Sequence, residues 1–353
     1  MLALLAREPQ GVHMGILDWL FGGNDEATGS AVAPAVIEQR IEQIVRIINP
    51  RLKLVPGYRR KLVPAVEQAV LYCREVEAQI PPAIEASATV WAENPTLRAL
   101  FATARDIPEV FSRSRAVQDF FEARPGAEHV WATLRFLCRE ATGFGVVAEG
   151  GVVKHEVVQT CVSFTDKKVV LPSGCEHDAR IEIRRRAFKF LLTEALQQIT
   201  SVDMQRQDLK AQRSMLQARL MILKGQRVGL EAMLEEGAGA RQKIEEVERK
   251  LSENERALAA FPSTGETLEE VIGRVREVLT HGPDYLRIDR TKLRLDQMNV
   301  LMPEGSGEVA AEIVLPKVVV RSAPVVSLLA CRFPRDELIR SKRLLHQAGQ
   351  LLG

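Results

Sequence analysis

The sequence predicts a mainly α-helical protein with a smaller antiparallel β part, which is an α+β fold. The first observation behind this prediction is a long heptad repeat of apolar residues within residues 177–282. The second is a series of short, proline-punctuated segments in residues 34–141, and the third is a pair of runs rich in β-branched residues, at 142–176 and 283–334. Helices and strands segregated in this way favour an α+β arrangement over an alternating α/β one.

Composition sets limits on the partners and on the compartment. The chain has 353 residues, is 46% hydrophobic and carries a formal net charge of +2, so it can bury a sizeable core but offers no bulk electrostatic attraction to nucleic acid. Its five cysteines are odd in number and lack a Cys-x-x-Cys pair, which favours a reducing compartment and hence a cytoplasmic protein. No apolar run approaches ~18 residues, so we expect no transmembrane segment.

Residues 1–33 are expected to be a flexible N-terminal segment. They contain a short apolar peptide at 15–21, followed by a stretch at 22–33 that is rich in Gly, Ala, Ser and Asp. A short apolar peptide on a tether is typical of a docking segment for a partner groove or a membrane interface. The alternative is that the peptide folds back onto its own domain.

Residues 34–141 predict an α-helical bundle. Proline marks the expected starts and ends of its short helices, as at Pro34, Asn49-Pro50 and Asn94-Pro95. One helix is expected to carry Ile84, Ala88 and Trp91, and the last one to span residues 128–139. The large aromatic residues expected to fill the bundle core are Trp91, Trp131, Phe101, Phe120 and Phe136.

The two β-rich runs are expected to pair with each other. In 142–176, strands at 146–147, 152–164 and 168–171 with turns at 149–151 and 165–167 predict an antiparallel meander. In 283–334, apolar and charged residues alternate from Leu286 to Leu295, and β-branched runs follow. Because a three-stranded meander alone is marginally stable, we hypothesise that both β segments join in one sheet. Residues 335–353 predict a C-terminal amphipathic helix.

The long helical stretch predicts a coiled coil. Its apolar series advances by alternate steps of three and four, the period of a heptad repeat. The series runs Leu192, Ala195, Ile199, Val202, Arg206, Leu209, Arg213, Leu216, Leu220, Leu223, Arg227, Leu230 and Leu234. A second series, out of phase with the first, runs Ile244, Val247, Leu251, Asn254, Leu258 and Phe261.

The two series predict a helical hairpin. The change of phase coincides with Gly237–Gly239, where we expect a tight turn and a returning helix. The alternative is one uninterrupted helix that dimerises. After Pro262, the sequence Thr267-Leu268-Glu269-Glu270 predicts a capping box that starts a further helix, ending at His281-Gly282-Pro283.

Two sets of polar residues in this stretch have more than one interpretation. Arg206, Arg213, Arg227 and Asn254 interrupt the apolar rows, either to fix register or because long stems lie along the seam with their charges in water. A basic cluster within 180–189 could contact an anionic partner, or could pair with acidic residues. Its members are Arg180, Arg184, Arg185, Arg186 and Lys189.

No catalytic, cofactor or metal site is predicted. Residues 143–148 match Gly-x-Gly-x-x-Ala, but they do not join a strand to a helix as a dinucleotide site requires. The soft donors His155, Cys161, Cys175 and His177 lack the paired spacing of zinc ligands, and Cys175 with His177 matches no motif of a cysteine nucleophile.

We therefore expect a non-enzymatic interaction or scaffold protein. A projecting coiled-coil arm would serve partner binding or self-association, because an apolar seam tends to be buried against another helix. The alternative is a peripheral protein that binds nucleic acid or a membrane surface through the basic cluster 180–189 and the apolar peptide 15–21. Of these partners, the composition favours protein over nucleic acid.

Overall fold

The computed structural model describes residues 32–149, 152–226, 237–260, 267–303, 310–321 and 324–339. The chain divides into two compact units. The first comprises Met1–Val36, Glu67–Phe190 and His281–Gly353, and the second comprises Ile37–Val66 and Leu191–Thr280. The apolar peptide 15–21 and most of the expected C-terminal helix, residues 340–353, lie outside the described residues.

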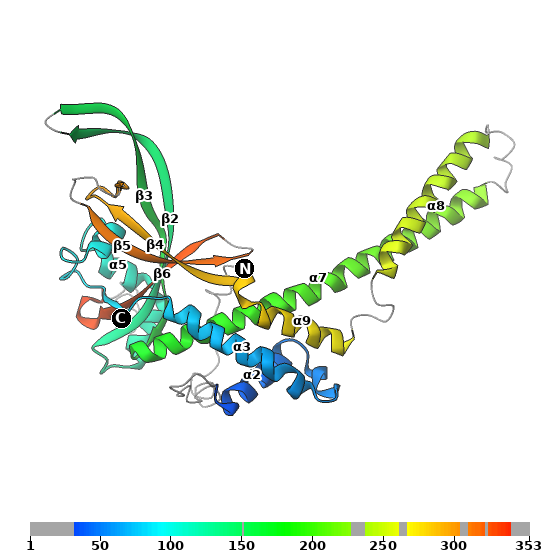
Figure 1. Cartoon of the computed structure of the whole chain (residues 1–353), viewed down its shortest axis with the longest axis horizontal. Coiled ribbons are helices and arrows are strands. Elements are labelled where there is room, and N and C mark those ends of the chain that lie inside the picture. The colour runs from blue at the N-terminus through cyan, green and yellow to red at the C-terminus, as the bar shows by residue number, and fades with distance from the viewer. Residues whose placement is uncertain are drawn as a thin grey trace, which may run out of the picture. The chain divides into compact units, whose positions relative to one another are not determined.

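The α+β class is confirmed, because long helices accompany a largely antiparallel sheet (Figure 1). The sheet belongs to the first unit and has the strand order β3-β2-β6-β5-β4, with β1 pairing in parallel with β6. Its strands are β1 (Ile84–Glu85), β2 (His129–Glu149), β3 (Val152–Ser173), β4 (Leu286–Leu295), β5 (Ala311–Val320) and β6 (Val326–Pro334). Because β2 pairs with β6, the two β segments of the sequence share one sheet, as hypothesised.

The core of the first unit lies between the sheet and three short helices. These are α4 (Pro95–Leu100), α5 (Asp106–Arg113) and α6 (Arg115–Ala123), and their apolar side chains join those of the strands in one buried cluster. Within this cluster the rings of Phe111 from α5 and Phe333 from β6 stack, with centroids 4.7 Å apart. Apolar burial of this kind is the main stabilising term in folding, so this cluster anchors the helices to the sheet.

The prediction of a helix is wrong for two segments within residues 34–141. Residues 84–85 form β1, and the segment expected to be a helix at 128–139 is the first half of β2. In β2 the side chains of Val130, Ala132, Leu134 and Phe136 are fully or almost fully buried, with the period of two of a strand. Thr133 and Arg135 on the other face are buried too, so this part of β2 is buried on both faces.

The expected three-stranded meander is also wrong. The turn predicted at 165–167 is an irregularity within β3, where the pairing register with β2 shifts between Arg135 and Leu137. Asp166 takes a left-handed backbone conformation there, with φ of 50°, and its carboxylate accepts from Arg135 and pairs with Lys168. Figure 1 shows β2 and β3 as one long hairpin that continues past the other strands. Gly150 and Gly151, between the two strands, lie outside the described residues.

The second unit is helical. It contains α2 (Pro34–Ile47) from Ile37 onward, η2 (Pro50–Leu54), the start of α3 (Tyr58–Ala78), most of α7 (Glu176–Gln226), α8 (Gly237–Ala259) and α9 (Leu268–Thr280). Its most deeply buried side chains include Ile41, Ile44, Leu62, Val66, Leu192, Ala195, Val275 and Leu279.

The predicted capping box starts α9. The Glu270 backbone N–H donates to the Thr267 hydroxyl at 3.2 Å, and the Thr267 backbone N–H donates to the Glu270 carboxylate at 2.7 Å. These reciprocal bonds satisfy two donors that a helix start otherwise leaves without partners. The helix then ends at Thr280, immediately before the predicted stop at His281-Gly282-Pro283.

The expected turn at Gly237–Gly239 is wrong, because these residues form the first turn of α8. The connection between α7 and α8 falls at residues 227–236, which lie outside the described residues. Glycine costs about 1 kcal/mol relative to alanine inside a helix, but at a helix start fewer backbone hydrogen bonds depend on the residue. The glycines therefore lie next to the connection between the two helices and are not part of it.

Candidate functional site

The predicted heptad positions of α7 and α8 are the ones that lose solvent exposure. Among the described side chains from Val202 to Lys224, six are less than fully exposed, and all six are predicted seam positions. In α8, Ile244, Val247 and Asn254 are buried, with 6%, 3% and 6% of their surface exposed. We call the predicted heptad positions of the two helices the inner seam, of which Arg213 is the one exposed member among the described side chains. It comprises Val202, Arg206, Leu209, Arg213, Leu216, Leu220 and Leu223 of α7, and Ile244, Val247, Leu251, Asn254 and Leu258 of α8.

Ion pairs beside the inner seam show the direction in which the helices run. Arg213 Nη2 lies 3.2 Å from the Glu255 carboxylate, and Lys224 Nζ lies 2.8 Å from the Glu248 carboxylate. Positions that come later in α7 therefore meet positions that come earlier in α8, so the two helices are antiparallel where they touch. Figure 1 shows α8 beside the C-terminal part of α7.

Asn254 is the one uncharged polar residue of the inner seam. Its amide nitrogen donates to the Leu209 carbonyl oxygen at 3.1 Å and to Gln212 Oε1 at 3.5 Å. Its own Oδ1 is buried and accepts no hydrogen bond. Because a shift of α8 along α7 would leave the buried amide nitrogen without an acceptor, Asn254 favours a single register.

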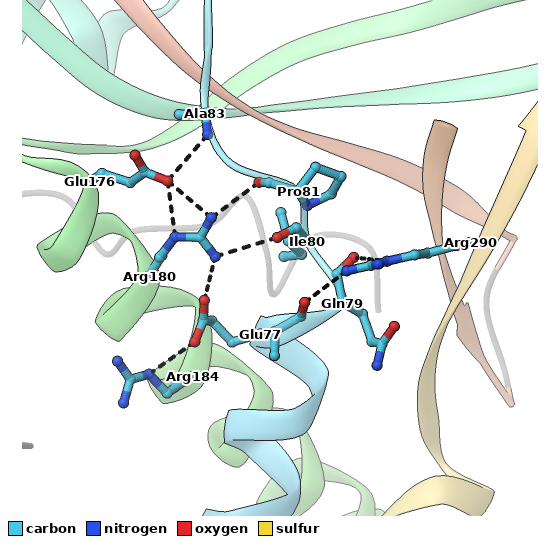
Figure 2. Close-up of polar contacts among 10 residues, drawn as sticks. Glu77, Gln79, Ile80, Pro81, Ala83, Glu176, Arg180, Arg184 and Arg290 are labelled. Atoms are coloured by element: carbon cyan, nitrogen blue, oxygen red, sulfur yellow. Dashed lines mark hydrogen bonds and ion pairs between the residues drawn. The ribbon is translucent and has the colours of Figure 1, made fainter. Parts of the chain in front are cut away.

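The basic cluster at the start of α7 is largely neutralised by acidic residues of the first unit. Arg180 is the centre of this network (Figure 2): its Nε and Nη2 lie 3.0 and 2.9 Å from Glu176 Oε1, and its Nη1 donates to Glu77. Arg184 Nε lies 3.7 Å from the other oxygen of Glu77. Burial disfavours the charged form of Arg180 and so lowers its pKa. The hydrogen bonds and ion pairs with Glu77 and Glu176 outweigh this effect and hold the pKa of Arg180 above the ordinary value.

The same network closes the C-terminal end of α3. Arg180 also donates to the carbonyl oxygens of Ile80 and Pro81, at 3.4 and 3.2 Å, and Arg290 of β4 donates to those of Ala78 and Gln79. A helix C-terminus exposes carbonyl oxygens and carries partial negative charge, and two guanidinium groups satisfy both. Figure 2 shows both arginines converging on this short segment.

The remaining arginines of the cluster also have acidic neighbours. Arg186 Nε lies 2.8 Å from the Glu182 carboxylate, and Arg185 lies 3.8 Å from it. Glu176 and Glu182 stand four residues from Arg180 and Arg186, a spacing that sequence alone could have shown. Glu77 is far away in the sequence and gave no such signal. The contacts therefore assign Arg180 and Arg184 to the packing of the first unit.

The described side chains of the candidate metal and catalytic residues are all exposed. Cys175 and His177 are both exposed at the start of α7, and Cys161 is exposed on β3. The His155 side chain lies outside the described set. Within the part of the chain that the structure describes, no group of three or more His, Cys, Asp or Glu could hold a metal ion. Residues 143–148 lie inside β2, so they do not form a strand-to-helix phosphate loop.

Burial keeps two thiols and one tyrosine hydroxyl protonated at neutral pH. Burial raises the pKa of the Cys331 thiol and of the Tyr72 hydroxyl to about 12, and it also raises the pKa of Cys138. A thiol is nucleophilic as the thiolate, so Cys138 and Cys331 are not activated nucleophiles. The Tyr72 hydroxyl instead donates to the Leu286 carbonyl oxygen.

The chain matches no family model, no curated protein and no solved structure. Of the helices that the structure describes, none combines the length and the apolar character needed to cross a membrane.

Proposed function

We propose that α7 from Val202 onward and α8 form an intramolecular coiled-coil hairpin, and that this hairpin, called the arm below, makes the chain an interaction or scaffold protein. The observation that carries the proposal is the loss of exposure at heptad positions along both helices. A heptad seam packed in this way is typical of coiled coils, which serve as rigid binding and association elements.

Two further features support a rigid arm. The polar contacts of Asn254 favour one register, and the ion pairs Arg213–Glu255 and Lys224–Glu248 flank the seam on the solvent side. Such exposed pairs add about 0.2–1 kcal/mol each, so they serve alignment more than stability. The apolar residues between them supply most of the stabilisation.

The hairpin is tested by joining Lys224 to Glu248 with a zero-length carbodiimide, which links an amine to a carboxylate in direct contact. We expect this crosslink in the unmodified chain, because the two groups lie 2.8 Å apart. Mixing isotope-labelled and unlabelled chains before the reaction separates links within one chain from links between chains. A crosslink found solely between chains would support the uninterrupted, dimerising helix instead.

The interaction role is tested by removing the arm. Residues 202–259 are replaced by a short Gly-Ser linker, and proteins that co-purify with this variant are compared with those of the full chain. We expect specific partners, including further copies of the chain, to be lost. The control is a full-length chain in which exposed Gln217 of α7 is changed to Lys, which leaves the inner seam intact. Unchanged partners in the deletion variant would assign the function to the first unit or to the remaining helices of the second.

The second candidate, peripheral binding to nucleic acid or a membrane surface, receives less support. Arg180, Arg184 and Arg186 of the basic cluster have carboxylate partners within the chain, which reduces the charge left for phosphate groups. We also propose a cytoplasmic location, on the ground of the odd number and wide spacing of the cysteines.

A further inference from the structure

We propose that two copies of this chain associate through the face of α7 that points away from α8. This inference rests on the arm proposed above and names its partner as a second copy. The surface, called the outer stripe below, consists of Met204, Asp208, Ala211, Met215, Ala218 and Ile222. Each member stands two residues after an inner-seam position of α7, and therefore about 200° further round the helix.

The outer stripe is apolar and open to solvent. Met204, Met215 and Ile222 expose 60%, 66% and 62% of their surface, and the neighbouring Met221 exposes 78%. Large apolar side chains in a row on one helix face are unusual on the surface of an isolated molecule and mark interaction sites. The stripe also keeps the alternate three- and four-residue steps of a heptad repeat, so it fits another helix.

The matching face of α8 differs. Two residues after its first four inner-seam positions stand Glu246, Arg249, Glu253 and Arg256, all exposed and all charged, and the residue two after Leu258 lies beyond the end of α8. Glu246 pairs with Lys250 and Arg249 pairs with Glu253 along the helix surface. This pattern is typical of a solvated helix face. Among the described side chains of the arm, the apolar outer surface therefore belongs to α7 alone.

The outer stripe is complementary in size to a second copy of itself. In an antiparallel pair of α7 helices related by a two-fold axis near residue 213, Met215 meets Ala211 of the other copy, and Met204 meets Ile222. A large side chain then lies opposite a small one at the centre, and two large ones close each end. A two-fold interface must be self-complementary in this way, because each residue pair occurs twice.

The outer stripe is also complementary in charge to a second copy. Its flanking positions are nearly all uncharged, so two copies would not repel each other. These positions are Gln205, Gln207, Gln212, Ser214, Arg219 and Met221. The antiparallel pairing sets Asp208 opposite Ala218 of the second copy, next to the oppositely charged Arg219 of that copy. An ionised residue in an apolar stripe is costly without a partner, and this arrangement supplies one for Asp208.

The test is sedimentation equilibrium of the full chain over a concentration series. We expect a reversible dimer. Changing Met215 and Ile222 together to Lys should raise the dimer dissociation constant by about 100-fold or more, since each change acts twice in a two-fold dimer. The control is Gln217→Lys, which adds one positive charge, against two in the test variant, at an exposed position of α7 outside the stripe and should leave the dimer intact. Circular dichroism of each variant checks that helix content is unchanged.

A charge exchange tests the pairing itself. Asp208→Arg and Arg219→Asp should each weaken the dimer, and the double variant should regain most of the original affinity. The proposal would be overturned if the unmodified chain were monomeric, or if Met215→Lys with Ile222→Lys left the dimer unchanged. It would also be overturned if Gln217→Lys weakened the dimer as much as that pair of changes, or if the double charge exchange restored no affinity. If the chain is monomeric and Lys224 still crosslinks to Glu248 within it, the result supports the arm and contradicts only the proposed association of two copies.

Discussion

Replacing Phe333 by Ala should destabilise the first unit by about 3–5 kcal/mol, because the change removes a fully buried ring and leaves a cavity. Phe333 is 0% exposed and stacks on Phe111, which is equally buried, so few neighbouring atoms can move in to fill the space. Urea unfolding followed by tryptophan fluorescence measures the effect, since Trp91 and Trp131 both lie in this unit. The thermal midpoint should fall by about 10 °C.

The matched control for this substitution is Phe144→Ala. Phe144 belongs to the same sheet but exposes 79% of its surface, where β2 and β3 pair with each other alone. Its loss should cost less than about 1 kcal/mol. Equal losses from the two substitutions would show that the Phe111–Phe333 stack does not hold the helices on the sheet.

Replacing Glu77 by Ala should destabilise the same unit by about 2–4 kcal/mol, because it removes the carboxylate between two largely buried guanidinium groups. Arg180 and Arg184 expose 22% and 17% of their side chains, and Glu77 exposes 13%. Arg180 would keep Glu176 and the carbonyl oxygens at the end of α3, whereas Arg184 would lose the carboxylate nearest to its Nε. The same urea unfolding experiment measures the change.

Glu182→Ala is the control for charge alone. Glu182 also pairs with two arginines, but all three residues lie on α7 and are more exposed, so we expect a loss below about 1 kcal/mol. Glu77→Gln should fall between the two, because the amide keeps an acceptor without the charge. If Glu77→Ala reduced the free energy of unfolding no more than Glu182→Ala, the network around Arg180 would contribute no more to stability than a surface ion pair.

Local patterns in the sequence predicted the local features of the fold. The alternate steps of three and four located the half-buried positions of α7 and α8, since a helix that packs along its length must repeat its contacts at that period. The Thr267–Glu270 capping box was equally predictable, because both its partners lie within one helical turn.

The joining of the two β segments in one sheet was hypothesised from the sequence, but the individual contacts between distant residues were not predictable. Residues 128–139 fit a helix as well as a strand, since Val130, Thr133 and Phe136 have helical spacing, and pairing with β6 decided the outcome. The bulge at Asp166 depends on Arg135 in the neighbouring strand. Likewise, the role of Arg180 depends on Glu77 and on carbonyl oxygens more than ninety residues away. No window of sequence contains these partners together.

The order of the strands has a consequence for synthesis of the chain. β6 pairs with β1, β2 and β5, yet it is the last of the described strands to be made, after all of α7, α8 and α9. Until the ribosome has released it, the edge of β2 from His129 to Phe136 has no neighbour to bond with, and contacts so distant in sequence form slowly. A growing chain with such an open edge can pair with the wrong strand, so nascent copies of this protein should depend on chaperones until β6 emerges.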